Sequence, residues 1–183
     1  DTVQAWATET HQISVERFVV SGVSKRGWTT WLAGAIDKRV CAIAPVVIDT
    51  LNMKAQTEWA ARVYGRQSEK ISDYTDLDLV DKMDMPEMVR LQGMVDPYSY
   101  RAHYTMPKLL ILGTNDPYWT VDSLRHYWND LPEPKAVYQA PNTGHRAGST
   151  PEAVRTLSEV LRMVAEGEDL PQMKWRMRGD GGA

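Results

Sequence analysis

The sequence holds a single cysteine in 183 residues, and this scarcity excludes two kinds of structure. With Cys41 alone, the chain forms neither an internal disulfide nor a cysteine-based zinc site. No apolar run approaches the ~18 residues that a membrane-spanning helix needs. An excess of one charge is also lacking, because 24 acidic residues face 21 basic ones and the net charge is −3. We therefore expect no nucleic-acid partner and no integral membrane segment in this chain.

The length of the chain indicates one domain, and its first residues indicate a piece of a longer protein. With 43% apolar residues, a chain of 183 residues is long enough for one domain with a sizeable core. It begins at Asp1 rather than methionine and reaches an apolar strand at residues 17–20. We interpret it as a piece of a longer protein whose upstream half is its partner. The glycine-rich tail at residues 179–183 is expected to be disordered.

Short apolar strands alternate with helical segments along the chain. The run VCAIAPVVI at residues 40–48 is continuously apolar, which is typical of a parallel strand buried on both faces. Strands are predicted at residues 17–20, 40–48, 108–112 and 135–139, and helices at residues 29–36, 121–130 and 151–165. This alternation predicts an α/β fold, with a mostly parallel sheet flanked by helices and spanning residues 1–178.

The segment at about residues 50–106, between the second and third predicted strands, has a different pattern. Helical stretches alternate there with Gly, Pro and Asp, and methionines and tyrosines are frequent. We predict a helical insertion that acts as a lid over a binding site. The alternative is that these aromatic and apolar side chains form the core of a helical subdomain.

Ser24 lies between the first predicted strand and a helix, in the sequence GVSKRG. A serine in this position is typical of a nucleophile elbow, G-x-S-x-G, but Arg26 stands where the second glycine belongs. Gly27, one residue later, could allow the close approach that this glycine normally provides. The alternative is that Ser24 only caps the helix.

Two further chemically active side chains follow predicted strands. Asp116 comes after the third strand and His145 after the fourth, and sites of parallel α/β sheets lie at these strand ends. The order Ser, Asp, His along the chain is that of α/β-hydrolases, in which an imidazole activates the serine and a carboxylate orients the imidazole. Asp116 precedes a proline and could instead belong to a turn. Asp49, at the end of the second strand, is the rival acid.

Three stretches carry a resemblance to a known family: SKRGWTTWLAGAIDKRVCAIAPVVIDTLNM, LLILGTNDPYW and PNTGHR. They resemble the PhoPQ-activated pathogenicity-related family, a branch of the α/β-hydrolase superfamily, over most of the chain. The resemblance implies that Ser24, Asp116 and His145 form a catalytic triad. It also implies larger parent proteins, often with an export signal, which favours a secreted or periplasmic location. Some relatives have signalling roles.

The basic residues after Ser24 resemble those of glucuronoyl esterases, which have a basic residue after the serine and a glycine at the third position. By this analogy the Lys25 N–H is an oxyanion donor, and the side chain of Lys25 or Arg26 adds positive charge. The alternative is that Arg26 pairs with a surface carboxylate. Trp28 and Trp119 follow the serine and the acid, and they are candidate walls of a substrate pocket.

The resulting prediction is a serine hydrolase that acts on a small-molecule ester or peptide without cofactor or metal. The second oxyanion donor of this fold comes from an upstream loop, and losing one donor costs ~10²–10³ in rate, so we expect the isolated chain to be a weak catalyst. Two alternatives remain open. One is a secreted, non-catalytic binding or signalling protein, and the other is a glucuronoyl-esterase-like carbohydrate esterase.

Overall fold

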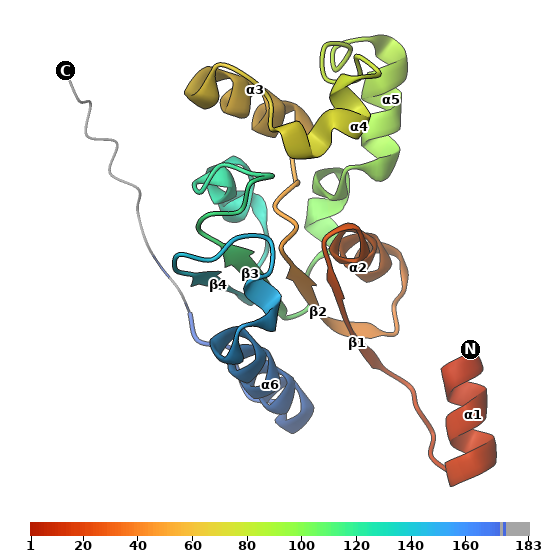
Figure 1. The fold of residues 1–183 in the computed structure, drawn as a ribbon. Helices are drawn as coiled ribbons and strands as arrows, with labels where there is room; N and C mark the ends of the chain where they lie inside the picture. The colour runs from red at the N-terminus through yellow and green to blue at the C-terminus, as the bar shows by residue number, and fades with distance from the viewer. Residues whose placement is uncertain (173, 175–183) are drawn as a thin grey trace.

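A parallel four-stranded sheet lies at the centre of the chain, which we describe from a computed structural model (Figure 1). The structure describes residues 1–172 and 174. The strands follow one another across the sheet in chain order, as β1 (Phe18–Val23), β2 (Val40–Val46), β3 (Lys108–Gly113) and β4 (Lys135–Ala140). All three neighbouring pairs are parallel. The predicted α/β class and the four predicted strands are confirmed.

The first strand and the helix after it are longer than the sequence pattern indicated. β1 continues to Val23 because its pairing with β2 continues through Gly22 opposite Pro45 and Val23 opposite Val46. The following helix, α2 (Lys25–Ile36), begins directly after Ser24 rather than at residue 29. Ser24 therefore occupies the single residue between a strand and a helix.

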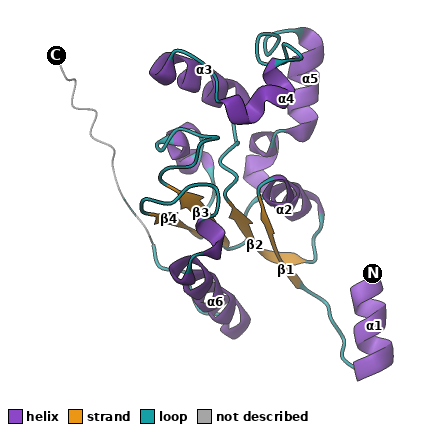
Figure 2. Cartoon of the chain, in the orientation of Figure 1, coloured by secondary structure: helices purple, strands orange, loops and turns teal. Residues whose placement is uncertain are grey.

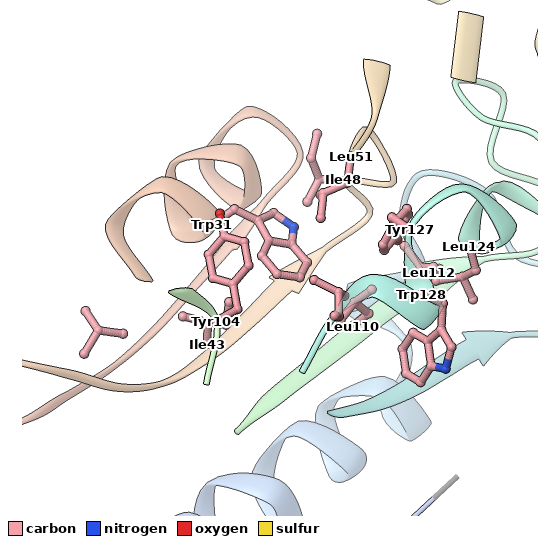
Figure 3. Close-up of a cluster of buried hydrophobic side chains, with 12 residues drawn as sticks. Trp31, Ile43, Ile48, Leu51, Tyr104, Leu110, Leu112, Leu124, Tyr127 and Trp128 are labelled. Carbon is pink, nitrogen blue, oxygen red and sulfur yellow. The ribbon is translucent and has the colours of Figure 1, made fainter. Parts of the chain in front are cut away.

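Helices cover both faces of the sheet (Figure 2). Side chains of β3 alternate between two hydrophobic clusters, with Leu110 and Leu112 in one and Leu109 and Ile111 in the other. The first cluster contains Trp31 of α2 together with aromatic residues from the segment between β3 and β4 (Figure 3). The second lies against α6 (Pro151–Glu166). Burial on both faces explains why β2 and β3 read as continuous apolar runs.

The segment between β2 and β3 is helical, as predicted, and we call it the insertion. It contains α3 (Met53–Tyr64), η1 (Glu69–Ile71), α4 (Ser72–Thr75), α5 (Pro86–Val95) and η2 (Pro97–His103). Its helices α3, α4 and α5 gather on the side of the sheet where the strands end (Figure 1). The buried Asp96 carboxylate joins its two ends, because it accepts hydrogen bonds from the N–H groups of Asn52, Met53 and Tyr98.

The helix predicted at residues 121–130 is wrong as a single element. Two short 3-10 helices take its place, η3 (Ser123–His126) and η4 (Trp128–Asp130). Tyr127 separates them with non-helical dihedrals, φ −154° and ψ −18°. This bend allows consecutive aromatic residues, Tyr127 and Trp128, both to enter the first core cluster (Figure 3).

The two ends of the described chain are helical. α1 (Thr2–His11) precedes β1, and α6 follows η5 (Ala147–Ser149), with the Thr150 hydroxyl capping α6 at the N–H of Ala153. The tail predicted at residues 179–183 lies outside the described residues. Within residues 1–172 and 174, no helix combines the length and the apolar character needed to cross a membrane.

Candidate active site

Ser24 sits in a sharp turn between β1 and α2. Its dihedrals are φ 57° and ψ −124°, a combination that non-glycine residues rarely adopt and that strained functional turns maintain. The Ser24 N–H donates to the carbonyl of Val46 at 2.9 Å, which fixes the turn to the end of β2. The backbone of this segment has the form of a nucleophile elbow.

Glycines on both sides of Ser24 make this turn sterically feasible. A Cβ added to Gly22 would lie 2.5 Å from the carbonyl oxygen of Arg26, and one added to Gly27 would lie 2.5 Å from Cγ2 of Ile48. Both distances are shorter than any ordinary carbon contact, so neither position has room for a side chain. The prediction that Gly27 provides the close approach in place of a glycine at residue 26 is confirmed.

Ser24, His145 and Asp116 form a continuous chain of hydrogen bonds. The imidazole Nε2 of His145 lies 2.9 Å from the Ser24 hydroxyl, and its Nδ1 lies 2.8 Å from Oδ2 of Asp116. An ionised carboxylate only accepts hydrogen bonds, so Nδ1 carries the proton and Nε2 accepts from the hydroxyl. The Ser24 side chain thus points to His145 and makes no capping bond to α2.

The loops that follow β3 and β4 are joined to each other, and this holds Asp116 beside His145. The Asn115 N–H donates to the Thr143 carbonyl at 3.0 Å, and the side-chain amides of Asn115 and Asn142 are hydrogen-bonded at 2.8 Å. Gly113 makes room for this crossing, since a Cβ there would lie 2.3 Å from the Thr143 oxygen.

Tyr118, which is not among the predicted site residues, contacts both Asp116 and His145. Its backbone N–H donates to the second oxygen of Asp116, Oδ1, at 3.0 Å. Its ring packs against the imidazole of His145 with centroids 4.3 Å apart. The signal in the sequence is the Asp-Pro-Tyr turn, because an aspartate in such a turn commonly accepts from the N–H two residues later.

Asp49, the rival acid, is bound elsewhere. It is buried and accepts a hydrogen bond of 2.6 Å from the hydroxyl of Tyr127. Burial raises the pKa of Asp49 to about 7, and the hydrogen bond from Tyr127 opposes this rise. The negative charge of Asp116 raises this pKa further. The geometry therefore brings Asp116, and not Asp49, to the imidazole.

The basic side chains of the elbow are exposed. Nζ of Lys25 lies 3.8 Å from the carboxylate of Asp73 in the insertion, with both side chains about three-quarters in solvent. The Arg26 side chain is also exposed, and no ion pair joins it to a carboxylate within the described residues. The alternative, in which Arg26 pairs with a surface carboxylate, is therefore not observed in this part of the chain.

Trp28 and Trp119, the two candidate pocket walls, both line a cavity that reaches Ser24. The indole N–H of Trp28 donates to the carbonyl of Val95 at 2.7 Å, which ties α2 to the end of α5. Among the described side chains, no three His, Cys, Asp or Glu residues are grouped so that they could hold a metal ion.

Known structures share this arrangement of sheet and helices. An acetyl xylan esterase from Paenibacillus sp. R4 superposes with a TM-score of 0.65 at 17% identity, covering 90% of this chain and 50% of that chain. A puromycin hydrolase superposes with a TM-score of 0.63 at 20% identity, covering 94% of this chain and 25% of that chain. These likenesses define the fold as that of an α/β-hydrolase.

The sequence places the chain more narrowly within this fold. Residues 1–183 match the model of the PhoPQ-activated pathogenicity-related protein family, and the chain belongs to that family. Autocrine proliferation repressor protein A from Dictyostelium discoideum is 37% identical over 179 residues. The match covers 96% of this chain but only 36% of that relative, so the chain spans about a third of the relative's length.

Proposed function

We propose that this protein is a serine hydrolase that cleaves a carboxylic ester or a peptide bond. The observation that carries the proposal is the hydrogen-bonded chain from Ser24 through His145 to Asp116. A hydroxyl becomes a useful nucleophile when a base takes its proton, and the base works when a carboxylate orients it. The hydrolase fold of the neighbouring structures supports the same proposal.

In the proposed mechanism, Oγ of Ser24 attacks the carbonyl carbon of the substrate while Nε2 of His145 takes the hydroxyl proton. Asp116 holds the imidazole in the required tautomer and stabilises its positive charge. The protonated imidazole then gives its proton to the leaving group, which departs and leaves an acyl group on Ser24. A water molecule, activated in the same way, hydrolyses this acyl-enzyme and restores the serine.

The start of α2 is the proposed oxyanion site. The first N–H groups of a helix have no partner within that helix, and those of Lys25, Arg26 and Gly27 begin α2 next to Ser24. We assign the Lys25 N–H as the oxyanion donor, with positive charge from the Lys25 and Arg26 side chains. The insertion acts as a lid over the site, and the mechanism needs no cofactor.

Substitution of Ser24 by alanine in the full-length protein tests this proposal. The matched control is Ser21→Ala, because Ser21 lies on β1, three residues before Ser24, and donates its hydroxyl to the Ala44 carbonyl at 2.7 Å. Hydrolysis of p-nitrophenyl butyrate is expected to fall to the buffer rate in Ser24→Ala and to persist in Ser21→Ala. Equal turnover in the two variants would refute the role of Ser24.

A second candidate function is signalling that does not require catalysis. It is favoured by the name of the relative that is 37% identical, an autocrine proliferation repressor protein. Ser24→Ala separates the two functions, since it removes the nucleophile while keeping the surface. Repression of proliferation by the Ser24→Ala variant, at the level of the unmodified protein, would support a binding role.

A further inference from the structure

A cavity of about 220 Å³ lies between the elbow and the insertion. Ser24 and Lys25 of the elbow belong to its lining, and Trp28 and Ile48 come from the α/β core. The insertion contributes a wall of aliphatic and thioether side chains, namely Ile71, Leu79, Val80, Met83, Met88 and Leu91. The space next to the serine hydroxyl is therefore bounded by apolar groups from two parts of the fold.

Several polar side chains in the wall already have hydrogen-bond partners. The Gln56 amide donates to the carbonyls of Leu51 and Ser123, and the Gln92 amide donates to the carbonyl of Met83. A sugar placed here would lose water from its hydroxyls without gaining these donors in return, which is costly. The cavity thus disfavours a carbohydrate in contact with its wall.

Charged groups of the lining remain in water rather than inside the cavity. The Lys25 and Asp73 side chains are 78% and 75% exposed, and Lys70 is exposed as well. Methionines in the wall adapt their shape to irregular apolar groups. An apolar interior with a charged, solvated rim fits a substrate whose apolar part enters while its polar part stays outside.

Resting on the serine-hydrolase proposal, we propose that this cavity binds an apolar group adjoining the scissile carbonyl of the substrate. Its size follows from the volume, because a cavity of about 150 Å³ holds one benzene. Scaled from that value, 220 Å³ holds about nine non-hydrogen atoms. A medium-length acyl chain and an aromatic amino-acid side chain both have this chemistry and this size.

Two series of ethyl esters, assayed by pH-stat with the full-length protein, test the proposal and separate the two sources. In the acyl series from acetate through butanoate and octanoate to palmitate, kcat/KM should rise by up to about fourfold for each methylene buried and fall again at palmitate. In the amino-acid series, N-acetyl-phenylalanine should exceed N-acetyl-alanine by more than tenfold. A rise in the acyl series would identify the bound group as an acyl chain, and a rise in the amino-acid series would identify it as an aromatic side chain.

Cavity variants give a second, independent readout. Val80→Phe fills the cavity and is expected to move the optimum to shorter or smaller groups, whereas Met88→Ala enlarges it and should favour larger ones. Val89→Phe is the matched control, because Val89 is exposed on α5 outside the lining. Preferences that stay the same in all three variants would overturn the assignment of the cavity.

The failures of the two proposals are distinguishable. Equal kcat/KM across both series, with hydrolysis still dependent on Ser24, would overturn the apolar-group proposal and leave the serine hydrolase standing. Absence of Ser24-dependent hydrolysis with every ester would overturn the serine-hydrolase proposal, and the substrate assignment would fall with it.

Discussion

Replacing Asp49 with asparagine is expected to remove a large pH dependence from the stability of the protein. The Asp49 carboxyl is buried, and burial raises its pKa from 3.8 to about 7. The folded state thus favours the neutral acid, whereas the unfolded chain ionises near pH 4. Between pH 4 and pH 7 the unfolded state binds fewer protons, so stability falls as pH rises through this window.

The size of the effect follows from this shift. A rise from 3.8 to about 7 corresponds to on the order of 4 kcal/mol, fully lost above pH 7. Asparagine has nearly the same shape, stays neutral at every pH and can still accept the hydrogen bond from Tyr127. Asp49→Asn should therefore match the unmodified protein near pH 4 and exceed it by about 2–4 kcal/mol at pH 8.

Urea unfolding at pH 4, 6 and 8 measures this difference directly. The exposed Asp81 gives a control, Asp81→Asn, that should follow the unmodified protein at all three values. A constant difference between Asp49→Asn and the unmodified protein from pH 4 to pH 8 would show that the pKa of Asp49 is not raised in the folded state. Turnover adds a second test, because Asp116→Asn should lower kcat by about 10⁴-fold, whereas Asp49→Asn should not. Loss of turnover in Asp49→Asn alone would show that the acid has been assigned wrongly.

Three further substitutions probe the elbow and the imidazole. Gly27→Ala should lower the free energy of unfolding by about 1–3 kcal/mol, because the added methyl group overpacks the elbow. Gly93→Ala is the control, and it should gain about 0.5–1 kcal/mol because its Cβ would meet open space. Equal urea midpoints for the two variants would contradict this prediction. Tyr118→Leu removes the ring beside His145 and should lower kcat about 2- to 12-fold. Tyr118→Phe keeps the ring and should keep the kcat of the unmodified protein. Equal kcat in the two variants would exclude a role for the ring. Arg26→Ala should unfold within about 0.5 kcal/mol of the unmodified protein and lower kcat about 2- to 5-fold. An unchanged kcat in the folded variant would remove Arg26 from the mechanism.

The sheet and the approximate positions of the three polar residues were accessible from the sequence. Continuous apolar runs such as residues 40–48 indicate parallel strands, and parallel strands place Ser24, Asp116 and His145 at one edge of the sheet. The position of Gly27, one residue after Arg26, also indicated that it replaces the missing glycine of the elbow. These features depend on short stretches of sequence, which is why they were predictable.

Features that depend on tertiary packing were not accessible in this way. Residues 121–130 have a helical pattern, but burial of Tyr127 and Trp128 together bends the chain between them. The hydrogen bond from Tyr127 to Asp49 joins residues 78 positions apart, so no local sequence pattern predicts it. The apolar cavity likewise exists only because the insertion folds back over the end of β2 and the start of α2.

Labelling with a fluorophosphonate, followed by mass spectrometry of the modified peptide, measures whether Ser24 is an activated nucleophile. The reagent reacts with an activated serine and requires no knowledge of the substrate. We expect modification of Ser24 in the folded, full-length protein, and none in His145→Ala, in which the serine has lost its base. A folded protein that shows no modification of Ser24, or equal modification with and without His145, would mean that His145 does not activate this serine.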